Sequence, residues 1–174
     1  LSKSVTNRLI LTGVLLMMNQ TQTQELLNKL KAHKKIRVAV TDIDGILRGK
    51  YMHVDKFISS LEKGFGFCNV VFGWDSQDNC YNNNDFSGWH NGYQDILAKP
   101  DPSTLRKIPW DQGTPLVLGD FWQTQDQPLS LCPRQLLAKV EKKAKSMGFQ
   151  TKVGIEFEWF NFRETPESLA TKKF

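Results

Sequence analysis

The spacing of apolar and polar positions along the first part of the chain predicts a helix followed by a β-hairpin. Residues 21–35 place leucines at helical spacing between polar positions, which predicts a short amphipathic helix. The nearly continuous apolar run of residues 36–43 is typical of a buried strand. Asp44 and Gly45 then predict a tight turn, and residues 46–53 alternate well enough to form the returning strand of the hairpin.

A second helix and several strands are predicted after the hairpin. Asp55 is placed to cap this helix and Gly64 to end it, with apolar residues on one face between them. A polar hinge over residues 123–128 is the best candidate for a domain boundary. The strand candidates of this region are residues 67–74, 96–98, 105–108 and 116–121.

The part of the chain after the hinge begins a new pattern. Residues 134–146 carry apolar side chains on one helical face, and residues 150–160 predict a strand. The last segment, residues 163–174, is polar and has no recognisable pattern. This order of elements indicates the α+β class, in which a small sheet domain is followed by the opening of a second domain.

A polar segment between the predicted strands, residues 75–94, is rich in Asn, Asp, Ser and Gly. It also holds aromatic residues, which a purely flexible linker would not need. Long loops of this kind are usually functional or packed against a neighbour. The aromatic residues of the segment are Tyr81, Phe86, Trp89 and Tyr93.

Composition and charge limit the cellular compartment and the kinds of binding partner that are expected for this chain. The chain has 174 residues and a formal net charge of +5, and no apolar run approaches the roughly 18 residues of a membrane span. Three cysteines without a C-x-x-C pair argue against a disulfide framework or a structural zinc site and favour the cytoplasm. Two basic clusters are better explained as solvated helix faces or flanks than as a nucleic-acid interface. Their members are Lys29, Lys31, Lys34, Lys35 and Arg37 in the first cluster, and Lys139, Lys142, Lys143 and Lys145 in the second.

The N-terminus has two interpretations. Residues 9–18 are apolar and follow Lys3 and Arg8, a pattern that faintly resembles a signal peptide. No small-residue cleavage site is evident, and the scattered cysteines argue against export. Translation that begins at Met17 or Met18 is therefore the favoured expectation.

The first candidate site is the strand end formed by residues 38–47, VAVTDIDGIL. An apolar strand followed by Asp-x-Asp-Gly resembles the first motif of haloacid-dehalogenase-type phosphatases. In that alternative Asp42 would attack phosphorus, Asp44 would be the general acid/base, and both would hold Mg²⁺. The following residues continue as a second strand, however, so a structural role of the two aspartates in a hairpin turn is favoured.

The second candidate is a pair of glutamates in the predicted strand near the C-terminus. Glu156 and Glu158 are two residues apart, so their side chains would leave the same face, opposite Phe157 and Trp159. Two adjacent carboxylates repel each other unless a cation or an arginine lies between them, and a hard divalent ion meets that need. A sheet with a polar, solvent-facing side explains the same spacing, so the spacing alone does not decide.

Asp75 and His90 are the remaining candidates. Asp75 follows a predicted strand in the run FGWDS, where a turn or cap role competes with a catalytic one. His90 lies among aromatic residues, but the histidines of the chain show no metal-ligand spacing. Neither residue identifies a reaction by itself.

Six segments, taken in order, form a specific combination of motifs. They are VAVTDIDGILRGKY (38–51), VFGWDS (71–76), DILAKPDPSTLRKIPW (95–110), PLVLGDF (115–121), CPRQLL (132–137) and GIEFEWFNF (154–162). Together they span residues 36–162, and the runs P-D-x-S-T-x-R-x-I-P-W and G-x-E-x-E-x-x-x-F are specific as a pair. In this order the segments resemble the N-terminal part of the glutamine synthetase family, and in particular its γ-glutamyl-amine ligase branch.

For the fold, this resemblance implies an N-terminal β-grasp domain over residues 36–122, preceded by an extension and helix over residues 1–35. Residues 128–174 would be the first helix and strand of a glutamine-synthetase-type catalytic domain. The resemblance also supports the hairpin-turn interpretation of Asp42 and Asp44 over the phosphatase alternative.

For the function, the resemblance implies ATP-dependent formation of a γ-glutamyl amide from glutamate and ammonia or an amine, through γ-glutamyl phosphate. Glu156 and Glu158 would each bind one of two divalent ions, Mg²⁺ or Mn²⁺. Asp75 would be a catalytic residue that reaches into a neighbouring subunit, where it holds ammonium and helps to draw off its proton. The implied assembly is a hexameric ring or a stacked dodecamer of identical subunits.

Two expectations qualify this resemblance. The chain has Trp-Asp-Ser where the family has a run like Asp-Gly-Ser-Ser, which leaves ammonia and an amine as alternative nitrogen donors. The other metal ligands, the ATP-binding segment and the glutamate-binding arginine of the family would follow Phe174, so the chain alone is expected to be inactive. A non-catalytic relative that retains the fold for assembly or regulation is the alternative from another functional class.

Overall fold

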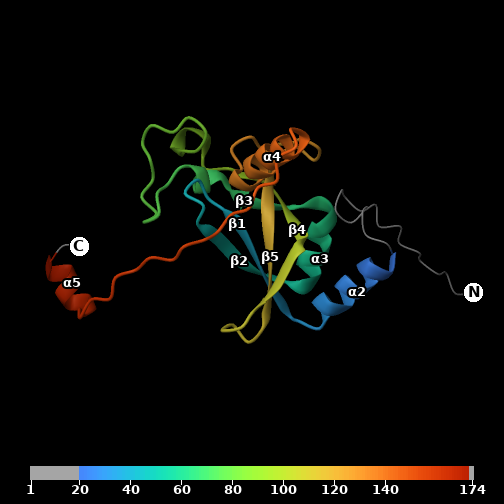
Figure 1. Cartoon of the computed structure of the whole chain (residues 1–174), viewed down its shortest axis with the longest axis horizontal. Helices are drawn as coiled ribbons and strands as arrows, with labels where there is room; N and C mark the ends of the chain where they lie inside the picture. Colours follow the sequence, from blue (N-terminus) through green and yellow to red (C-terminus); the bar gives the residue numbers. More distant parts are fainter. Residues whose placement is uncertain (1–19, 173–174) are drawn as a thin grey trace, which may run out of the picture.

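A five-stranded sheet forms the centre of the computed structural model, which describes residues 20–172 (Figure 1). The strands are β1 (Lys35–Thr41), β2 (Leu47–His53), β3 (Phe65–Cys68), β4 (Asp95–Ile108) and β5 (Thr114–Trp122). They lie in the order β2-β1-β5-β4-β3, in which β1 and β5 are parallel and the other neighbours are antiparallel. The N-terminal expectations, both the signal-peptide resemblance and the start at Met17 or Met18, lie outside the described residues.

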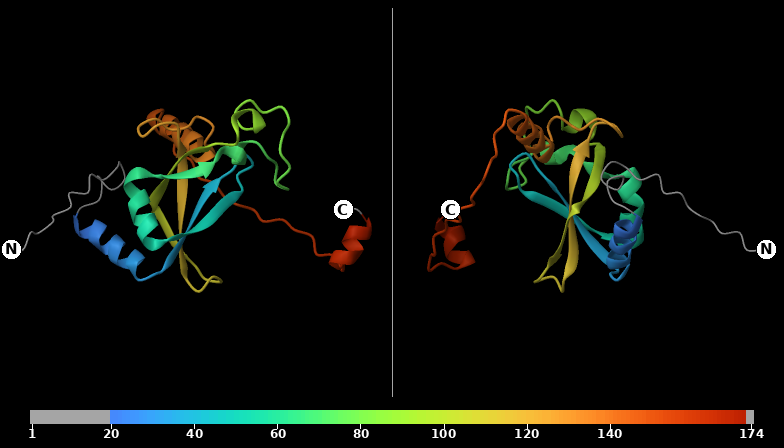
Figure 2. Two further views of the ribbon diagram at one scale, coloured as in Figure 1. Left: turned by 180° about the vertical axis from the view of Figure 1, so that it is seen from behind. Right: turned by 45° about the vertical axis from the view of Figure 1, so that its right-hand side comes forward.

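Two helices, α2 (Gln20–Lys31) and α3 (Val54–Lys63), lie together on one side of the sheet (Figure 2). Leu30 of α2 and Phe57 of α3 are almost completely buried in the core that the helices share with β1 and β5. Full burial of an aliphatic or aromatic side chain contributes about 1.5–3 kcal/mol, so apolar contact is the main stabilising term of this layer. The sheet residues of this core include Ile36, Val38, Val40, Val117 and Phe121.

The predicted hairpin is confirmed, because β1 and β2 pair antiparallel along their full lengths. Gly45 in the connecting turn has a φ of +81°, a left-handed conformation that glycine adopts without the steric cost of a Cβ atom. The turn residue type in the sequence is therefore the one that the backbone requires.

The cap of α3 differs from the prediction at its start and agrees with it at its end. The helix begins at Val54, so Asp55 lies in its first turn, and His53 is the cap: its Nδ1 accepts a hydrogen bond from the Asp55 backbone N–H at 3.3 Å. At the other end Gly64, with a φ of +72°, donates its N–H to the Ser60 carbonyl. An Asp at the second helical position still suits the positive end of the helix dipole.

The strand predicted over residues 67–74 is wrong beyond Cys68. β3 ends at Cys68, and η1 (Asn69–Phe72) is a 3₁₀ helix. The fully buried Asn69 side chain explains the bend: its Nδ2 donates to the Phe86 carbonyl at 3.2 Å, and its Oδ1 accepts from the Ser87 hydroxyl at 3.0 Å. These partners come from far along the sequence, which local apolar patterning does not reveal.

The two strands predicted at residues 96–98 and 105–108 are parts of one strand, β4. Its register against β5 shifts between Asp101 and Arg106, where the pairing is interrupted. Pro102 has no N–H to donate to the sheet ladder, and the Asp101 carboxylate accepts the Ser103 N–H at 3.0 Å instead. The polar gap in the pattern is a bulge within a strand.

The helix predicted after the hinge is confirmed, but the strand after it is wrong. α4 spans Pro133–Ser146, whereas residues 149–165 contain no helix or strand. A strand needs a partner to pair its backbone groups, and the described part of the chain supplies none for this segment. Its apolar side chains are consequently exposed, namely Val153, Ile155, Phe157, Trp159, Phe160 and Phe162.

A short helix, α5 (Pro166–Lys172), follows where no pattern was recognised. The signal was local: the Thr165 hydroxyl accepts the Ser168 N–H at 3.2 Å, and the Ser168 hydroxyl accepts the Thr165 N–H at 2.9 Å. This reciprocal cap, with Pro166 in the first helical position, is a known helix start. None of the helices in residues 20–172 has both the length and the apolar character needed to cross a membrane.

Candidate functional site

Asp42 has a structural environment that fits the hairpin turn and not a phosphatase nucleophile. Its side chain is fully buried at the end of β1. Its Oδ1 accepts the backbone N–H groups of Asp44 at 3.0 Å and Ile46 at 2.8 Å, and its Oδ2 accepts Arg48 Nε at 2.7 Å. A carboxylate with both oxygens occupied and no exposed surface cannot approach a phosphorus atom. The turn interpretation of Asp42 is thereby supported.

Asp75 lies in a tight turn that is closed by the bridge between Trp74 and Cys80. The Asp75 Oδ1 accepts the backbone N–H groups of Gln77 at 2.8 Å and Asn79 at 2.9 Å, and its Oδ2 accepts Asn79 Nδ2 at 3.0 Å. The hydrogen bonds from the Asn79 side chain and backbone lower the pKa of the Asp75 carboxyl. The turn role proposed from the sequence is confirmed, and it leaves a half-buried, ionised carboxylate at a fixed place.

The remainder of the polar segment is pinned to the core by one side and exposed on the other. The Phe86 ring packs edge-on against Phe72, with ring centroids 5.7 Å apart, and the Asn84 Nδ2 donates to the Phe72 carbonyl at 2.6 Å. Trp89, in the 3₁₀ helix η2 (Trp89–Asn91), is 88% exposed and contacts Tyr93 at a centroid distance of 5.2 Å. The segment is thus anchored to the core on one side, and the Trp89 ring is exposed on the other.

His90 has a structural role in this segment. Its Nε2 donates to the Asp85 carbonyl at 3.0 Å, which closes a short stretch of the loop. None of the described residues forms a group of three or more His, Cys, Asp or Glu side chains that could hold a metal ion. His90 is thus not brought into a metal site by the fold of residues 20–172.

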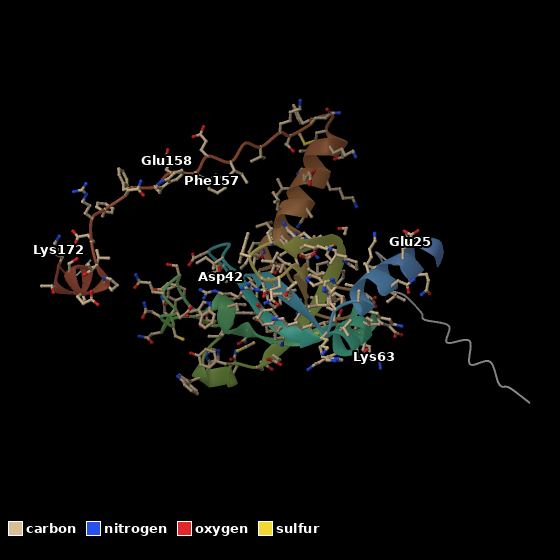
Figure 3. All side chains as sticks on the ribbon, turned by 90° about the horizontal axis from the view of Figure 1, so that it is seen from below. Glu25, Asp42, Lys63, Phe157, Glu158 and Lys172 are labelled. Atoms are coloured by element: carbon tan, nitrogen blue, oxygen red, sulfur yellow. The ribbon has the colours of Figure 1, made fainter. Side chains whose placement is uncertain are left out.

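Glu156 and Glu158 lie in the extended segment between α4 and α5, and both are exposed. Figure 3 shows Glu158 and Phe157 on a stretch that arches away from the sheet, far from Asp42. Carboxylate oxygens are the donors that Mg²⁺ and Mn²⁺ prefer, so the chemistry of the pair fits such an ion. Two carboxylates supply only part of a coordination shell, so further ligands would have to join them.

α4 is fixed to the sheet by Arg134 at its first turn. Arg134 Nε donates to Asp120 Oδ1 at 2.6 Å, and its Nη2 donates to Asp101 Oδ2 at 2.8 Å. Burial raises the pKa of the Asp120 carboxyl, and the hydrogen bond from Arg134 opposes that rise. Beyond this anchor, the apolar face predicted for the helix is exposed at Leu136 and Val140.

The site residues that the sequence singled out are therefore not assembled into one centre. Asp75 is held in its turn by hydrogen bonds, while Glu156 and Glu158 are exposed on the extended segment. The residue that sequence reasoning passed over is Arg48, which bonds both to Asp42 and to the loop that carries Asp75. The available sequence signal was an arginine on the predicted returning strand, six residues after an aspartate near the end of the apolar strand.

Comparisons with known proteins point to one group of enzymes. A scan against models of known protein families finds no match. The chain is 50% identical over 151 residues to type-1 glutamine synthetase 2 of Dictyostelium discoideum, which covers 86% of this chain and 29% of that protein. It is 36% identical over 140 residues to the glutamate–isopropylamine ligase of a Pseudomonas species, with coverage of 80% and 30%. The chain thus spans less than a third of the length of these relatives.

Solved structures agree in fold. A crystal structure of a glutamine synthase homologue superimposes with a TM-score of 0.56 at 21% identity, over 66% of this chain and 27% of that chain. An ADP complex of the protein GmaS gives a TM-score of 0.52 at 20% identity, over 70% of this chain and 26% of that chain. The curled five-stranded sheet with its helices is therefore an arrangement found in this group of proteins.

Proposed function

The chain is a relative of the glutamine synthetase family over most of its length, and we propose that it is the N-terminal part of an ATP-dependent carbon–nitrogen ligase. The observation that carries this proposal is the 50% identity to a glutamine synthetase across 86% of the chain. The reaction is the formation of a γ-glutamyl amide from glutamate and ammonia or a primary amine. The catalytic part that completes the site lies in the two thirds or more of the relatives' length that this chain does not span.

The proposed reaction has two steps. An oxygen of the glutamate γ-carboxylate attacks the γ-phosphorus of ATP, so that γ-glutamyl phosphate forms and ADP leaves. The nitrogen of ammonia or the amine then attacks the acyl carbon, phosphate leaves, and the nitrogen gives up a proton. Two further relatives, a γ-glutamylethanolamide synthetase and a γ-glutamylanilide synthase, support an amine as well as ammonia as the donor.

In this proposal Asp75 holds the nitrogen donor in the active site of a neighbouring subunit. Its hydrogen bonds from Gln77 and Asn79 keep the carboxylate ionised, and a fixed negative charge attracts ammonium or an alkylammonium ion. The exposed Trp89 lies on the same polar segment and provides an aromatic contact for the neighbouring subunit. A ring of identical subunits, one hexamer or two stacked, is the assembly that would bring such a loop to a second chain.

Glu156 and Glu158 are proposed as metal ligands, one for each of two divalent ions, Mg²⁺ or Mn²⁺. Bound divalent ions would supply charge neutralisation for the phosphate groups. The two glutamates offer oxygen donors on an extended segment whose apolar residues are exposed. Pairing of this segment with strands outside the described residues would bury those side chains and place both carboxylates on one face.

The fold supports a finer assignment, an N-terminal β-grasp domain over residues 36–122. The supporting features are the central parallel pair of β1 and β5, the β1–β2 hairpin at one side of it, and α3 across the sheet. Residues 128–174 would then begin the catalytic domain, with α4 as its first helix. The anchoring of Arg134 to Asp120 joins these two proposed units.

The test of this proposal uses the protein at its native length, purified from its own cells. Glutamate, ATP and Mg²⁺ or Mn²⁺ are supplied with ammonium, isopropylamine or ethanolamine in separate reactions, and products are identified by mass spectrometry. A γ-glutamyl amide that forms together with ADP and phosphate supports the ligase. Its absence with every nitrogen donor overturns the ligase and favours the non-catalytic alternative.

An Asp75→Asn variant connects that activity to this chain. The loss of the charge is expected to raise the KM for the nitrogen donor and to lower turnover, while the KM for ATP stays near its original value. Asp85→Asn is the matched control, because Asp85 is an exposed aspartate on the same polar segment. Equal kinetics for the two variants would contradict the role of Asp75.

A further inference from the structure

Arg48 lies between the β1–β2 hairpin and the loop that carries Asp75, two segments that run side by side in Figure 2. On the hairpin side, Arg48 Nε donates to Oδ2 of the fully buried Asp42 at 2.7 Å. On the loop side, Nη1 donates to Asp78 Oδ1 at 2.5 Å and Nη2 to the Asp75 carbonyl oxygen at 3.3 Å. One guanidinium thus connects two segments that are separated by about thirty residues.

Trp74 completes this contact. Arg48 Cζ lies 4.7 Å from the centroid of the Trp74 ring, within the range of a cation–π interaction. The Arg48 side chain is only 18% exposed, whereas Asp78 is 59% exposed, so the anchor is shielded and its loop partner is accessible. A planar guanidinium bonds a carboxylate, a carbonyl and a ring face at once, which the single ammonium of lysine does not do.

The turn that Arg48 contacts is strained at its tip. Asp78 has a φ of +64°, a conformation that non-glycine residues seldom adopt without support from their surroundings. The Asp75 carbonyl accepts the Asp78 N–H at 3.1 Å as well as the bond from Arg48. Arg48 therefore bonds to both ends of this turn, and the described bonds of the Asp75 carboxylate come from Gln77 and Asn79 inside it.

We infer that Arg48 is a positioning residue that fixes the place of Asp75 relative to the hairpin. Asp42 binds the Arg48 guanidinium on the hairpin side, and Asp78 and Trp74 contact it on the loop side. The inference rests on the proposed role of Asp75 toward the nitrogen donor. Bonds within the turn orient the Asp75 carboxylate, and Arg48 sets where the whole turn lies. A displacement of about 1 Å at a reacting group can cost about 100-fold in rate, so the anchor matters to the second step of the reaction.

The sharpest test changes the accessible end of the anchor. Asp78→Ala in the native-length protein removes the bond to Nη1 and leaves the Asp42–Arg48 pair intact. Asp85→Ala is the matched control on the same segment. Hydrogen exchange of the amides of residues 75–79 is expected to rise about fivefold in Asp78→Ala, the effect of losing one partly exposed ionic hydrogen bond. The KM for the nitrogen donor is expected to rise by a similar factor, and the KM for ATP to stay unchanged.

Arg48→Lys is the second variant, because full removal of Arg48 would leave Asp42 buried without its cation. Lysine keeps a positive charge near Asp42 but cannot also bond to Asp78 and to the Asp75 carbonyl. The hydrogen exchange of the amides of residues 75–79 should therefore rise at least as much as in Asp78→Ala. Exchange rates equal to those of Asp85→Ala in both variants would overturn the inference. Faster exchange without any change in the KM for the nitrogen donor would support the anchor and contradict the proposed role of Asp75.

Discussion

Arg134 and Asp120 join α4 to β5 through a hydrogen-bonded ion pair of 2.6 Å between Nε and Oδ1. Both side chains are largely shielded, with 28% and 19% of their surfaces exposed. Removal of one partner of a shielded pair leaves the other charge partly buried and without a counter-charge. Together with the bond from Arg134 to Asp101, this pair anchors the first turn of α4 to the sheet.

Arg134→Met is expected to destabilise the protein by about 2–3 kcal/mol, somewhat below the value for a fully buried pair. Burial already raises the pKa of the Asp120 carboxyl, so the folded state binds its proton more tightly than the unfolded state does. The stability of the protein therefore falls as the pH rises from the ordinary pKa of an aspartate through the raised pKa of Asp120. Without Arg134 the pKa rises further, so the loss is larger at neutral pH than in acid. Urea unfolding at two pH values measures this, and Lys142→Met on the exposed part of α4 is the control. Equal losses at both pH values would contradict the account.

Gly45→Ala tests the turn of the first hairpin. The φ of +81° at Gly45 costs an alanine about 1–2 kcal/mol, although no atom lies within 4 Å of the added Cβ. Gly154→Ala is the control, because its Cβ also meets nothing and its φ lies outside the left-handed range. Thermal unfolding should separate the two variants, and a Gly45→Ala protein as stable as the control would show that the turn is not strained.

Asn79→Ala tests the cause of the low pKa of Asp75. The Asn79 side chain is the largest contributor to that lowering, so the pKa of Asp75 is expected to move up toward its usual range. Because the folded pKa is depressed, the carboxylate stabilises the turn above the ordinary pKa and ceases to do so as the pH falls through the folded value. A carboxyl ¹³C titration by NMR measures the shift. Asn82→Ala, at an exposed position on the same segment, should leave the pKa unchanged.

Glu156→Gln and Glu158→Gln test the proposed metal ligands separately. Each variant is expected to raise the concentration of Mg²⁺ or Mn²⁺ for half-maximal activity at least about tenfold, because one charged oxygen ligand is lost. Glu141→Gln, an exposed glutamate on α4, is the control. Unchanged metal dependence in both variants would remove these residues from the site.

Local signals predicted the parts of the fold that local residues determine. The Asp44-Gly45 turn and the end of α3 at Gly64 follow from turn and cap chemistry within a few residues, and α4 follows from the helical spacing of apolar residues over 134–146. The strand predicted over residues 150–160 failed because strand formation depends on a partner, and alternation alone supplies none. The sequence pattern predicts two short strands on either side of the bulge at Asp101, because Pro102 interrupts the ladder inside one strand.

The resemblance to a known family predicts a catalytic role for Asp75. No local sequence pattern predicts the contacts of Arg48. Asp42 is 6 residues from Arg48 in the sequence, Asp75 is 27 residues away and Asp78 is 30 residues away. No short window of sequence therefore contains the whole contact. Only the sheet register and the return of the chain through Trp74 bring these groups together.

The most direct test of the proposed ligase follows oxygen atoms through the reaction. The native-length protein is supplied with ATP, Mg²⁺, a nitrogen donor and glutamate that carries ¹⁸O in its γ-carboxylate, and the released phosphate is examined by mass spectrometry. A γ-glutamyl phosphate intermediate requires that one ¹⁸O appear in each phosphate, together with one γ-glutamyl amide. Phosphate that is unlabelled, or that forms at the same rate without glutamate, would contradict the assignment of this chain to a γ-glutamyl amide ligase.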